Sequence, residues 1–169
     1  NTSDSDSNAD TYRPRYRFRF GAKAHVYKDL NLVFRLATGG SGTTTTSNQT
    51  MDGTFGQDPI DVNLAYVSYD ASRWFKGLSI EAGKTKNPFM RTQIIWDNDV
   101  NFEGIHETIE RSYGDTKVDL VFSQYVVEET ARTTGAALDD TILYGNQIQL
   151  AQKTNFGKFE LGAAYYLYT

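Results

Sequence analysis

Apolar and polar residues alternate strictly near the start of the chain, over residues 12–26. One parity is aromatic or aliphatic, and the other is mostly cationic. The apolar parity comprises Tyr12, Pro14, Tyr16, Phe18, Phe20, Ala22, Ala24 and Val26. Side chains of a β-strand point alternately to opposite faces, so this pattern predicts one long strand with an apolar face and a basic face. Soluble strands usually have about five or six residues, and this one is longer.

The same alternation recurs along the rest of the chain. It predicts further strands in the ranges 30–37, 61–66, 78–83, 104–113, 118–122, 142–150 and 159–167. Within 61–66, the apolar parity is Val62, Leu64 and Tyr66. The range 104–113 has the weakest pattern, because charged side chains share a parity with its isoleucines. About eight strands and no amphipathic helix indicate an all-β fold.

The connections between these strands alternate between short and long. Short turns are expected around 27–29, 114–115 and 153–157, a connection of medium length at 70–77, and long loops at 39–59, 85–103 and 129–140. Consecutive antiparallel strands place odd and even connections at opposite ends of a sheet, and short turns at one end with long loops at the other are typical of outer-membrane barrels. We therefore expect an antiparallel up-and-down transmembrane β-barrel over residues 12–168, and a flexible extracellular loop or arm over residues 1–11.

The direction of the strands predicts where the ends of the chain lie. Short turns are periplasmic in bacterial barrels, which would place both ends outside the cell, whereas complete barrels keep their termini in the periplasm. We therefore expect at least one further strand upstream and one downstream. The sequence would then be an internal part of a larger porin barrel of roughly ten or more strands.

Composition narrows the functional classes. The 169 residues contain no cysteine, which excludes disulfides, thiolate zinc sites and cysteine nucleophiles. A net charge of −4 argues against a general nucleic-acid binder, and two histidines are too few for most histidine metal sites. Mean hydropathy is −0.52, and no run approaches the about 18 apolar residues of a membrane helix. Barrel strands are nonetheless polar on average, because they alternate.

Four stretches of the chain carry a resemblance to a known family. They are RYRFRFGAKAHVYKDLNLVFRLATGGSG, IDVNLAYVSYDAS, GLSIEAGKTKNPF and IIWDNDVNFEGI. Their arginine-alternating strand, RLATG strand end, GK-x-x-NPF stretch and W-D-x-D-x-x-x-EG loop resemble the bacterial putative porins, which are outer-membrane barrels. The resemblance is specific over residues 12–105 and continues as a pattern through 168. It implies a general or modestly selective diffusion channel, with a further strand before the arginine-rich one, and it does not identify the solute.

The same resemblance implies a role for the segment 85–103. Counted with one missing strand, this segment is the third extracellular loop, which folds into the lumen in many trimeric porins. Asn87, Pro88 and Phe89 would make a sharp bend and Trp96 would pack, while charged residues would face the passage. Those charged residues are Arg91, Asp97, Asp99 and Glu103. A homotrimer is a further expectation.

The basic parity of the first strand is the main candidate site. Guanidiniums two residues apart lie about 7 Å from one another and repel unless water or counter-charges screen them. In a barrel they would face the lumen, where charged side chains and pore width set selectivity. The expected pore-lining residues are Arg13, Arg15, Arg17, Arg19, Lys23, Arg35 and Glu81. Other interpretations are the solvated face of a soluble strand, or an inert wall paired with neighbouring acids.

Aromatic residues near the expected strand ends predict two girdles at the headgroup level of a membrane. These residues are Tyr12, Tyr27, Tyr66, Trp74, Phe75, Tyr125, Tyr144, Phe156 and Tyr165. Ordinary packing within the sheet is the alternative interpretation.

Two acidic clusters and one histidine offer weaker chemistry. Residues 97–99 and the pair 139–140 have oxygen ligands that suit calcium, but neither continues into a full metal-loop pattern, so turn formation is the favoured interpretation. His106 lies beside Glu107 and could act as a general base, but no serine partner stands in a recognisable motif. We therefore expect no enzymatic activity, no cofactor and no metal.

The leading hypothesis is a passive channel in the bacterial outer membrane. Outward apolar residues would contact lipid and lipopolysaccharide, and inward polar residues would hold water through which small hydrophilic solutes or ions diffuse. The alternative is a soluble β-barrel or sandwich that binds a lipid or sugar, with a dry apolar interior. An outer-membrane lipase or protease is a third hypothesis, and it needs a catalytic constellation that the sequence does not present.

Overall fold

The computed structural model describes residues 12–39, 45–53, 55–92, 94–128 and 140–169. Over these residues the fold is all-β, with ten strands and no helix. The described part of the chain therefore contains no helix with the length and hydropathy that crossing a membrane requires. The arm expected over 1–11 and most of the loop expected over 129–140 lie outside the described residues.

Eight of the strands form one antiparallel sheet. They are β2 (Arg19–Tyr27), β3 (Leu30–Thr38), β5 (Ile60–Asp70), β6 (Leu78–Lys86), β7 (Asn101–Tyr113), β8 (Thr116–Glu128), β9 (Thr141–Thr154) and β10 (Gly157–Tyr168). Their order is β10-β9-β8-β7-β6-β5-β3-β2, so each strand pairs with its neighbour in the chain once β4 is set aside. The seven strands expected from residue 30 onward are confirmed, including the weakly patterned range 104–113, which lies within β7.

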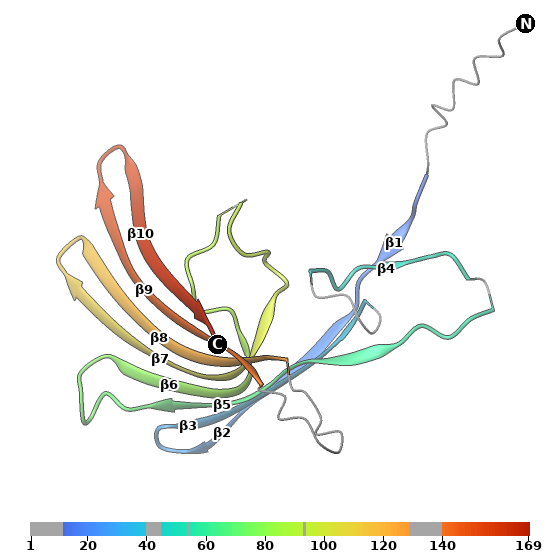
Figure 1. Ribbon diagram of the computed structural model, residues 1–169, viewed down its shortest axis with the longest axis horizontal. Coiled ribbons are helices and arrows are strands. Elements are labelled where there is room, and N and C mark those ends of the chain that lie inside the picture. The colour runs from blue at the N-terminus through green and yellow to red at the C-terminus, as the bar shows by residue number, and fades with distance from the viewer. Residues whose placement is uncertain (1–11, 40–44, 54, 93, 129–139) are drawn as a thin grey trace, which may run out of the picture.

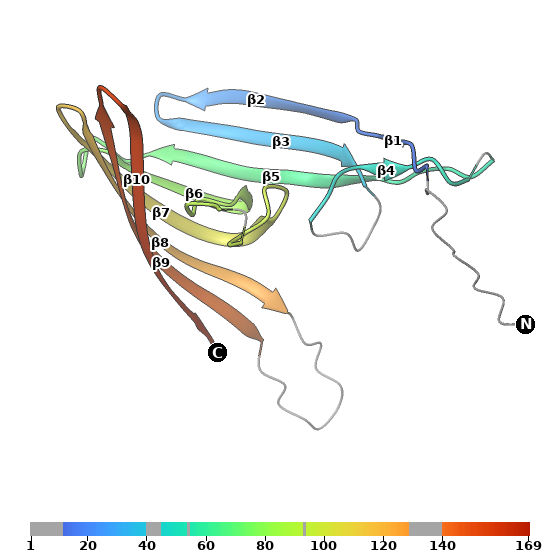
Figure 2. The same ribbon diagram turned by 90° about the horizontal axis from the view of Figure 1, so that it is seen from above.

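The sheet is strongly curved and open. Figures 1 and 2 show the strands following a curve from β2 to β10, so the sheet has a convex and a concave side. We call the space on the concave side the hollow. Within the described residues, β2 and β10 each pair on one side only. The prediction of about eight up-and-down antiparallel strands is confirmed, whereas the sheet itself is not closed into a barrel.

The connections lie at opposite ends of the sheet, as their lengths predict. The turns that join β2 to β3, β5 to β6, β7 to β8 and β9 to β10 lie together at the left of Figure 1. The longer connection between β6 and β7 leaves from the other end. This arrangement places the long connections of the described chain on one side of the molecule.

The strand expected over 12–26 is divided in two. Its first part, β1 (Arg15–Tyr16), pairs with β4 (Gln49–Thr50) in a separate small sheet, so the loop expected over 39–59 contains a strand. The division follows from the end of β3. Thr38 donates its N–H to the Phe18 carbonyl at 3.0 Å, and Gly39 then turns the chain at a φ of 131°. Residues before Phe18 therefore have no partner in β3 and pair with β4 instead.

The sequence pattern predicts the wrong face of the sheet for Leu64 and Tyr66 in β5. Arg35 of β3 lies opposite Leu64, but the next residue, Leu36, lies opposite Val62, so β5 contains one extra residue at this point. Such a bulge reverses the alternation of faces beyond it. Leu64, which is 1% exposed, therefore faces the hollow together with Tyr66, whereas Val62 lies on the outer face with 47% exposure.

Two glycines lie opposite one another in the middle of the sheet. Gly83 of β6 pairs with Gly104 of β7, at φ values of 121° and 151° that residues with side chains rarely adopt. Tyr66 and Tyr125 are their partners on the flanking strands. Glycines at such positions permit sharp bending of a sheet, which fits the strong curvature between β5 and β8.

The outer, convex face of the sheet is apolar and exposed. The large apolar side chains that the register places there are Phe20, Leu32, Phe34, Val67, Ile105, Phe122, Ile148, Leu150, Phe159, Leu161, Tyr165 and Leu167. Near the middle of β7, β8 and β9 the same face also carries Glu107, Gln124 and Asn146. A contiguous apolar surface of this extent is unusual for a soluble monomer and marks a contact with lipid or with another protein.

Candidate functional site

The connection between β6 and β7, residues 87–100, lies inside the hollow of the sheet. Figures 1 and 2 show it on the concave side of the sheet, and its residues contact β9 and β10. We call this segment the inner loop. It is shorter than the expected loop of 85–103, because β6 continues to Lys86 and β7 begins at Asn101.

The inner loop is held on one side by an aromatic cluster, which we call the aromatic anchor. Phe89 is 3% exposed, and its ring lies 5.2–6.4 Å from the ring centroids of four other aromatic residues. Those four are Trp96, Phe102, Tyr125 and Tyr166. The Trp96 indole also donates a hydrogen bond to the Tyr166 hydroxyl at 2.9 Å. The cluster joins the inner loop to β7, β8 and β10.

Backbone contacts fix the same part of the loop. The Asn87 side chain accepts a hydrogen bond from the Phe89 N–H at 2.8 Å, and Gln147 of β9 accepts one from the Met90 N–H at 2.6 Å. Trp96 has a φ of 60°, a left-handed conformation that costs a residue with a side chain about 1–3 kcal/mol. Its packing against Phe89 and its hydrogen bond stabilise this conformation.

The other side of the inner loop is held by charge, in what we call the ionic anchor. Asp99 lies 2.6 Å from a guanidinium nitrogen of Arg19 and 3.6 Å from one of Arg17. Asp99 also accepts a hydrogen bond from the Ser47 N–H at 3.3 Å, and Ser47 in turn accepts one from Arg19 Nε at 2.9 Å. The carboxylate of Asp99 therefore ties the inner loop to β2 and to the segment before β4.

The electrostatic surroundings of Asp99 favour its charged form. Partial burial raises its pKa, but the hydrogen bond and charge of Arg19, the Ser47 N–H and the charge of Arg17 lower it more. The pKa of Asp99 therefore lies below the ordinary value for a carboxyl group. The ionic anchor is stable at neutral pH.

The remaining basic residues expected in the lumen are divided between two places. On the eight-stranded sheet, Lys23 and Arg35 lie on the concave face by register, and Arg35 donates to the Asn63 side chain at 2.6 Å. Arg13 and Arg15 lie instead at the small sheet, where Arg13 donates to the Thr50 hydroxyl at 3.3 Å. The structure thus brings Arg17, Arg19, Lys23 and Arg35 together around the hollow, and leaves Arg13 and Arg15 apart from them.

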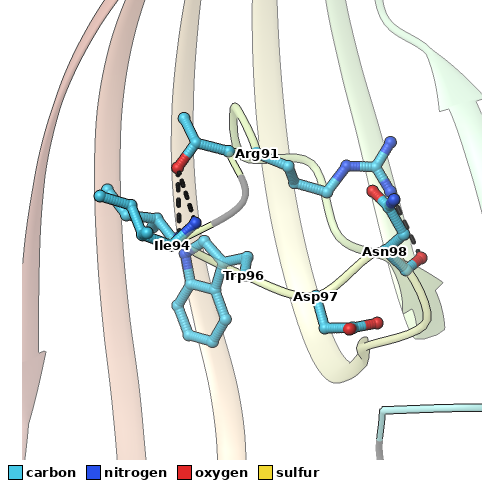
Figure 3. A pocket seen from close by; sticks show the side chains of 7 residues that line it. Arg91, Ile94, Trp96, Asp97 and Asn98 are labelled. Carbon is cyan, nitrogen blue, oxygen red and sulfur yellow. Dashed lines mark hydrogen bonds between the residues drawn. The ribbon is translucent and has the colours of Figure 1, made fainter.

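Two of the charged residues expected on the inner loop, Arg91 and Asp97, lie outside the ionic anchor that Asp99 forms. Both are exposed on the loop, and Asn98 accepts a hydrogen bond from Arg91 through its carbonyl at 3.4 Å. The inner loop encloses a pocket of about 470 Å³. Figure 3 shows Ile94 and Trp96 on one side of it and Asp97 and Asn98 on the other. It is lined by Arg91, Thr92, Ile94, Ile95, Trp96, Asp97 and Asn98.

The placement of Glu103 in the loop is wrong. Glu103 is the third residue of β7 and lies on the outer face, where it pairs with Lys84 of β6 at 2.6 Å. The GK-x-x-NPF and W-D-x-D-x-x-x-EG motifs extend past the loop into the flanking strands. Because Glu103 has the same parity as Ile105, it points away from the hollow.

His106 belongs to a buried polar network in the wall. Its Nδ1 lies 3.0 Å from the Tyr125 hydroxyl and 3.4 Å from the Thr85 hydroxyl, and its Nε2 lies 3.5 Å from Glu81. His106 is 4% exposed and Thr85 is fully buried, so this cluster has almost no contact with solvent. The network holds Glu81, the acidic residue expected in the lumen, and fixes the hydroxyl end of Tyr125 beneath the inner loop.

The girdle prediction is wrong for Tyr66 and Tyr125. Both face the hollow, and Tyr125 is 1% exposed because Phe89 and Phe102 cover it. Position near a strand end suggested a girdle, but parity decides the face. Tyr125 and Tyr166 are aromatic residues on the polar parity of their strands. That position is visible in the sequence, but it does not show which segment covers these side chains.

The two acidic clusters considered for calcium are residues 97–99 and the pair 139–140. In the first, Asp97 accepts a hydrogen bond from the Asp99 N–H at 2.8 Å, which is a turn, and Asp99 is engaged by arginines. Among the described residues, no three or more histidine or acidic side chains are grouped so that they could hold a metal ion. Asp139 of the second cluster lies outside the described residues.

The fold and the inner loop together define a class of protein. An up-and-down antiparallel sheet with an exposed apolar outer face, a polar inner face and a long loop folded against that inner face is the arrangement of porin-type proteins. A family model described as "Putative porin" matches residues 2–169, and the chain belongs to this family. A search of curated proteins finds no match for the chain.

Proposed function

We propose that the protein forms a water-filled channel in the bacterial outer membrane, through which small hydrophilic solutes or ions diffuse passively. The observation that carries the proposal is the inverted polarity of the sheet. Its convex face exposes large apolar side chains, while its concave face holds arginines, a lysine, a glutamate and a buried histidine. Family membership supports an outer-membrane location.

A membrane channel requires the sheet to close. Unpaired N–H and C=O groups at a strand edge are costly in hydrocarbon, and only a closed barrel satisfies them all. We propose that further strands pair with the open edges of β2 and β10. Residues 12–168 are then barrel strands and their connections.

The charges around the hollow give the channel a proposed preference for anions. Near the ionic anchor, Arg17, Arg19, Lys23 and Arg35 contribute four positive charges against the negative charges of Asp99 and Glu81. Elsewhere on the concave face of β7 to β10, positive and negative side chains are equal in number: Lys117, Lys153 and Lys158 with Glu110, Asp119 and Glu160. Charged rings in a narrow passage select ions of the opposite sign. The inner loop would bring Arg91 and Asp97 into the same passage, and transport would need no enzymatic step and no cofactor.

Association of three copies is part of the proposal. The outer face carries Glu107, Gln124 and Asn146 near the middle of its strands, where polar groups facing lipid are unfavourable. Contact between subunits would remove these side chains from lipid. The rest of the outer face would contact lipid and lipopolysaccharide. Because the chain has no cysteine, cross-linking of an Asn146→Cys variant in membranes tests this arrangement, with Leu161→Cys as a matched control on the same face.

The alternative function is a soluble barrel or sandwich that binds a lipid or sugar. It requires apolar residues inside and polar residues outside. Phe159 and Leu161, with 63% and 73% exposure on the outer face of β10, favour the channel.

Reconstitution in a planar bilayer tests the proposal. The protein should need detergent for purification and should give stepwise conductance. In a salt gradient, the reversal potential should indicate anion preference, and Arg19→Gln or Lys23→Gln should weaken it. Lys28→Gln, in the turn between β2 and β3, is the matched control and should change nothing. Purification without detergent, or conductance no greater than that of lipid alone, would contradict the channel.

A further inference from the structure

Gly145 of β9 lies directly beneath the aromatic anchor. It faces the hollow between Ser123 of β8 and Tyr166 of β10, its partners in the sheet. A Cβ at this position would overlap the Cζ of Phe89 and would lie 2.8 Å from the Ser123 hydroxyl. Its φ is outside the left-handed region, so the backbone does not require glycine here. The missing side chain makes room for Phe89.

Displacement of Phe89 would move the inner loop rather than one ring. The N–H groups of Phe89 and Met90 are both fixed by side chains, those of Asn87 and Gln147, and the ring packs on Trp96 within the same loop. The added Cβ would lie 2.4 Å from Phe89 Cζ. Carbon atoms in contact lie about 3.5–4.0 Å apart, so the ring would have to move outward by about 1.1–1.6 Å. The interior around Phe89 is close-packed and leaves little room for other rearrangement.

Gly162 of β10 provides a comparison on the same wall. A Cβ there would lie 2.8 Å from the sulfur of Met90, which is the flexible end of an unbranched side chain. Met90 can turn away at little cost, whereas the Phe89 ring cannot. The two glycines therefore differ in how strongly they determine the position of the loop.

We propose that Gly145 is a positioning residue that sets how far the inner loop projects into the hollow, and thereby the width of the passage. The first half of this inference, the position of the loop, does not depend on the proposed channel. The second half, the width of the passage, rests on it. Gly145 acts through Phe89: the smaller the wall residue, the deeper the ring sits and the wider the passage.

Trp96 fluorescence measures the first half directly. The chain has two tryptophans, and Trp74→Phe leaves Trp96 as the only reporter. In this background, in detergent, Gly145→Ala should shift Trp96 emission to the red and raise its quenching by acrylamide about twofold, because the cluster loosens. Gly162→Ala should change both much less. Gly56→Ala is the control, since its added methyl meets only a carbonyl at 3.7 Å.

A compensating substitution separates positioning from general damage. Phe89→Leu removes the ring atoms that an alanine at 145 would meet, so the pair Gly145→Ala and Phe89→Leu should resemble Phe89→Leu alone. If Gly145→Ala does not fold, restored folding of the pair supports the proposal, and failure of the pair overturns it. Unchanged Trp96 emission and quenching in a folded Gly145→Ala variant also overturns it.

Conductance tests the second half. Gly145→Ala should lower the single-channel conductance, whereas Gly56→Ala should leave it at the parent value. A shifted Trp96 signal with unchanged conductance would overturn the link to passage width. If the parent itself does not conduct, the proposed channel fails, and the fluorescence result on loop position still stands.

Discussion

The two anchors of the inner loop hold it by different physical means. The aromatic anchor is a cluster packed around the buried Phe89, and its strength depends on packing and on one hydrogen bond from Trp96. The ionic anchor is a carboxylate between guanidiniums that are 28% and 41% exposed. The packing of apolar side chains responds little to salt or pH. An exposed ion pair is weakened by added salt and by acid that protonates its carboxylate. We therefore expect the aromatic anchor to contribute most of the stability of the inner loop. The ionic anchor makes the stability of the loop depend on salt and pH.

The largest expected effect comes from removing the centre of the aromatic anchor. Phe89→Ala should lower the free energy of unfolding by about 3–5 kcal/mol, as deletion of a buried ring does, and should expose Trp96. Urea unfolding followed by Trp96 fluorescence measures both. Phe156→Ala, at a turn residue that is 97% exposed, is the control. Equal stability of the two variants would contradict a packed anchor.

Trp96→Phe should have a smaller effect. It keeps an aromatic ring but removes the N–H that donates to Tyr166, which costs about 0.5–1.5 kcal/mol together with some lost packing. The change should appear in the unfolding free energy measured by circular dichroism. Trp74→Phe, where the parent ring is 68% exposed, should leave stability unchanged. A stability loss as large as that of Phe89→Ala would contradict the central place of Phe89 in the cluster.

Asp99→Asn should change stability less still. It removes the charge of the ionic anchor while keeping its shape, and partly exposed ion pairs contribute about 0–1 kcal/mol. Its clearer consequence is electrostatic, because Arg17 and Arg19 would lose their counter-charge. In a bilayer, the reversal potential should shift toward stronger anion preference, while Asp52→Asn should not shift it. A shift toward cations would contradict the placement of Asp99 in the passage.

The smallest expected effect is the change in stability that the ionic anchor causes when the pH varies around neutrality. The pKa of Asp99 is lower in the folded protein than its usual value of 3.8, so its stabilising contribution is complete above that value. The contribution is lost as the pH falls through the lower, folded pKa. Carboxyl NMR titration should therefore give Asp99 a midpoint below its usual value of 3.8. The loss of stability in acid that follows protonation of Asp99 should be absent from Asp99→Asn. A midpoint above the usual value would contradict the arginine contacts.

The strands were predictable from the sequence because each face of the sheet has one environment along most of its length. Alternation therefore located every strand of the eight-stranded sheet from β3 onward. It missed β4, and it gave the wrong face where a bulge reverses it before Leu64 and Tyr66. The division at Phe18 was not predictable, because it depends on where β3 ends. Asp99 was selected for its charge, and the structure places it against the arginines of the first strand.

The aromatic anchor was largely not predictable. Its contacts join residues far apart in the chain, such as Phe89 with Tyr125 and Tyr166, and no local pattern encodes that pairing. Gly145 is similarly inconspicuous in the sequence, since only its contact with Phe89 shows why a side chain is missing there. Packing between distant segments is decided by the curvature of the sheet, which the alternation does not specify.

The central claim is that the outer face of the sheet contacts lipid and the inner face contacts water. Spin labels at single cysteines along β10 test it most directly, since the chain has no cysteine of its own. In lipid vesicles, labels at Phe159, Leu161 and Ala163 should collide mainly with oxygen, and labels at Lys158 and Glu160 mainly with a water-soluble nickel complex. The account predicts this alternation with a period of two residues. Uniform access of the nickel complex to all five positions, or the reverse alternation, would contradict it.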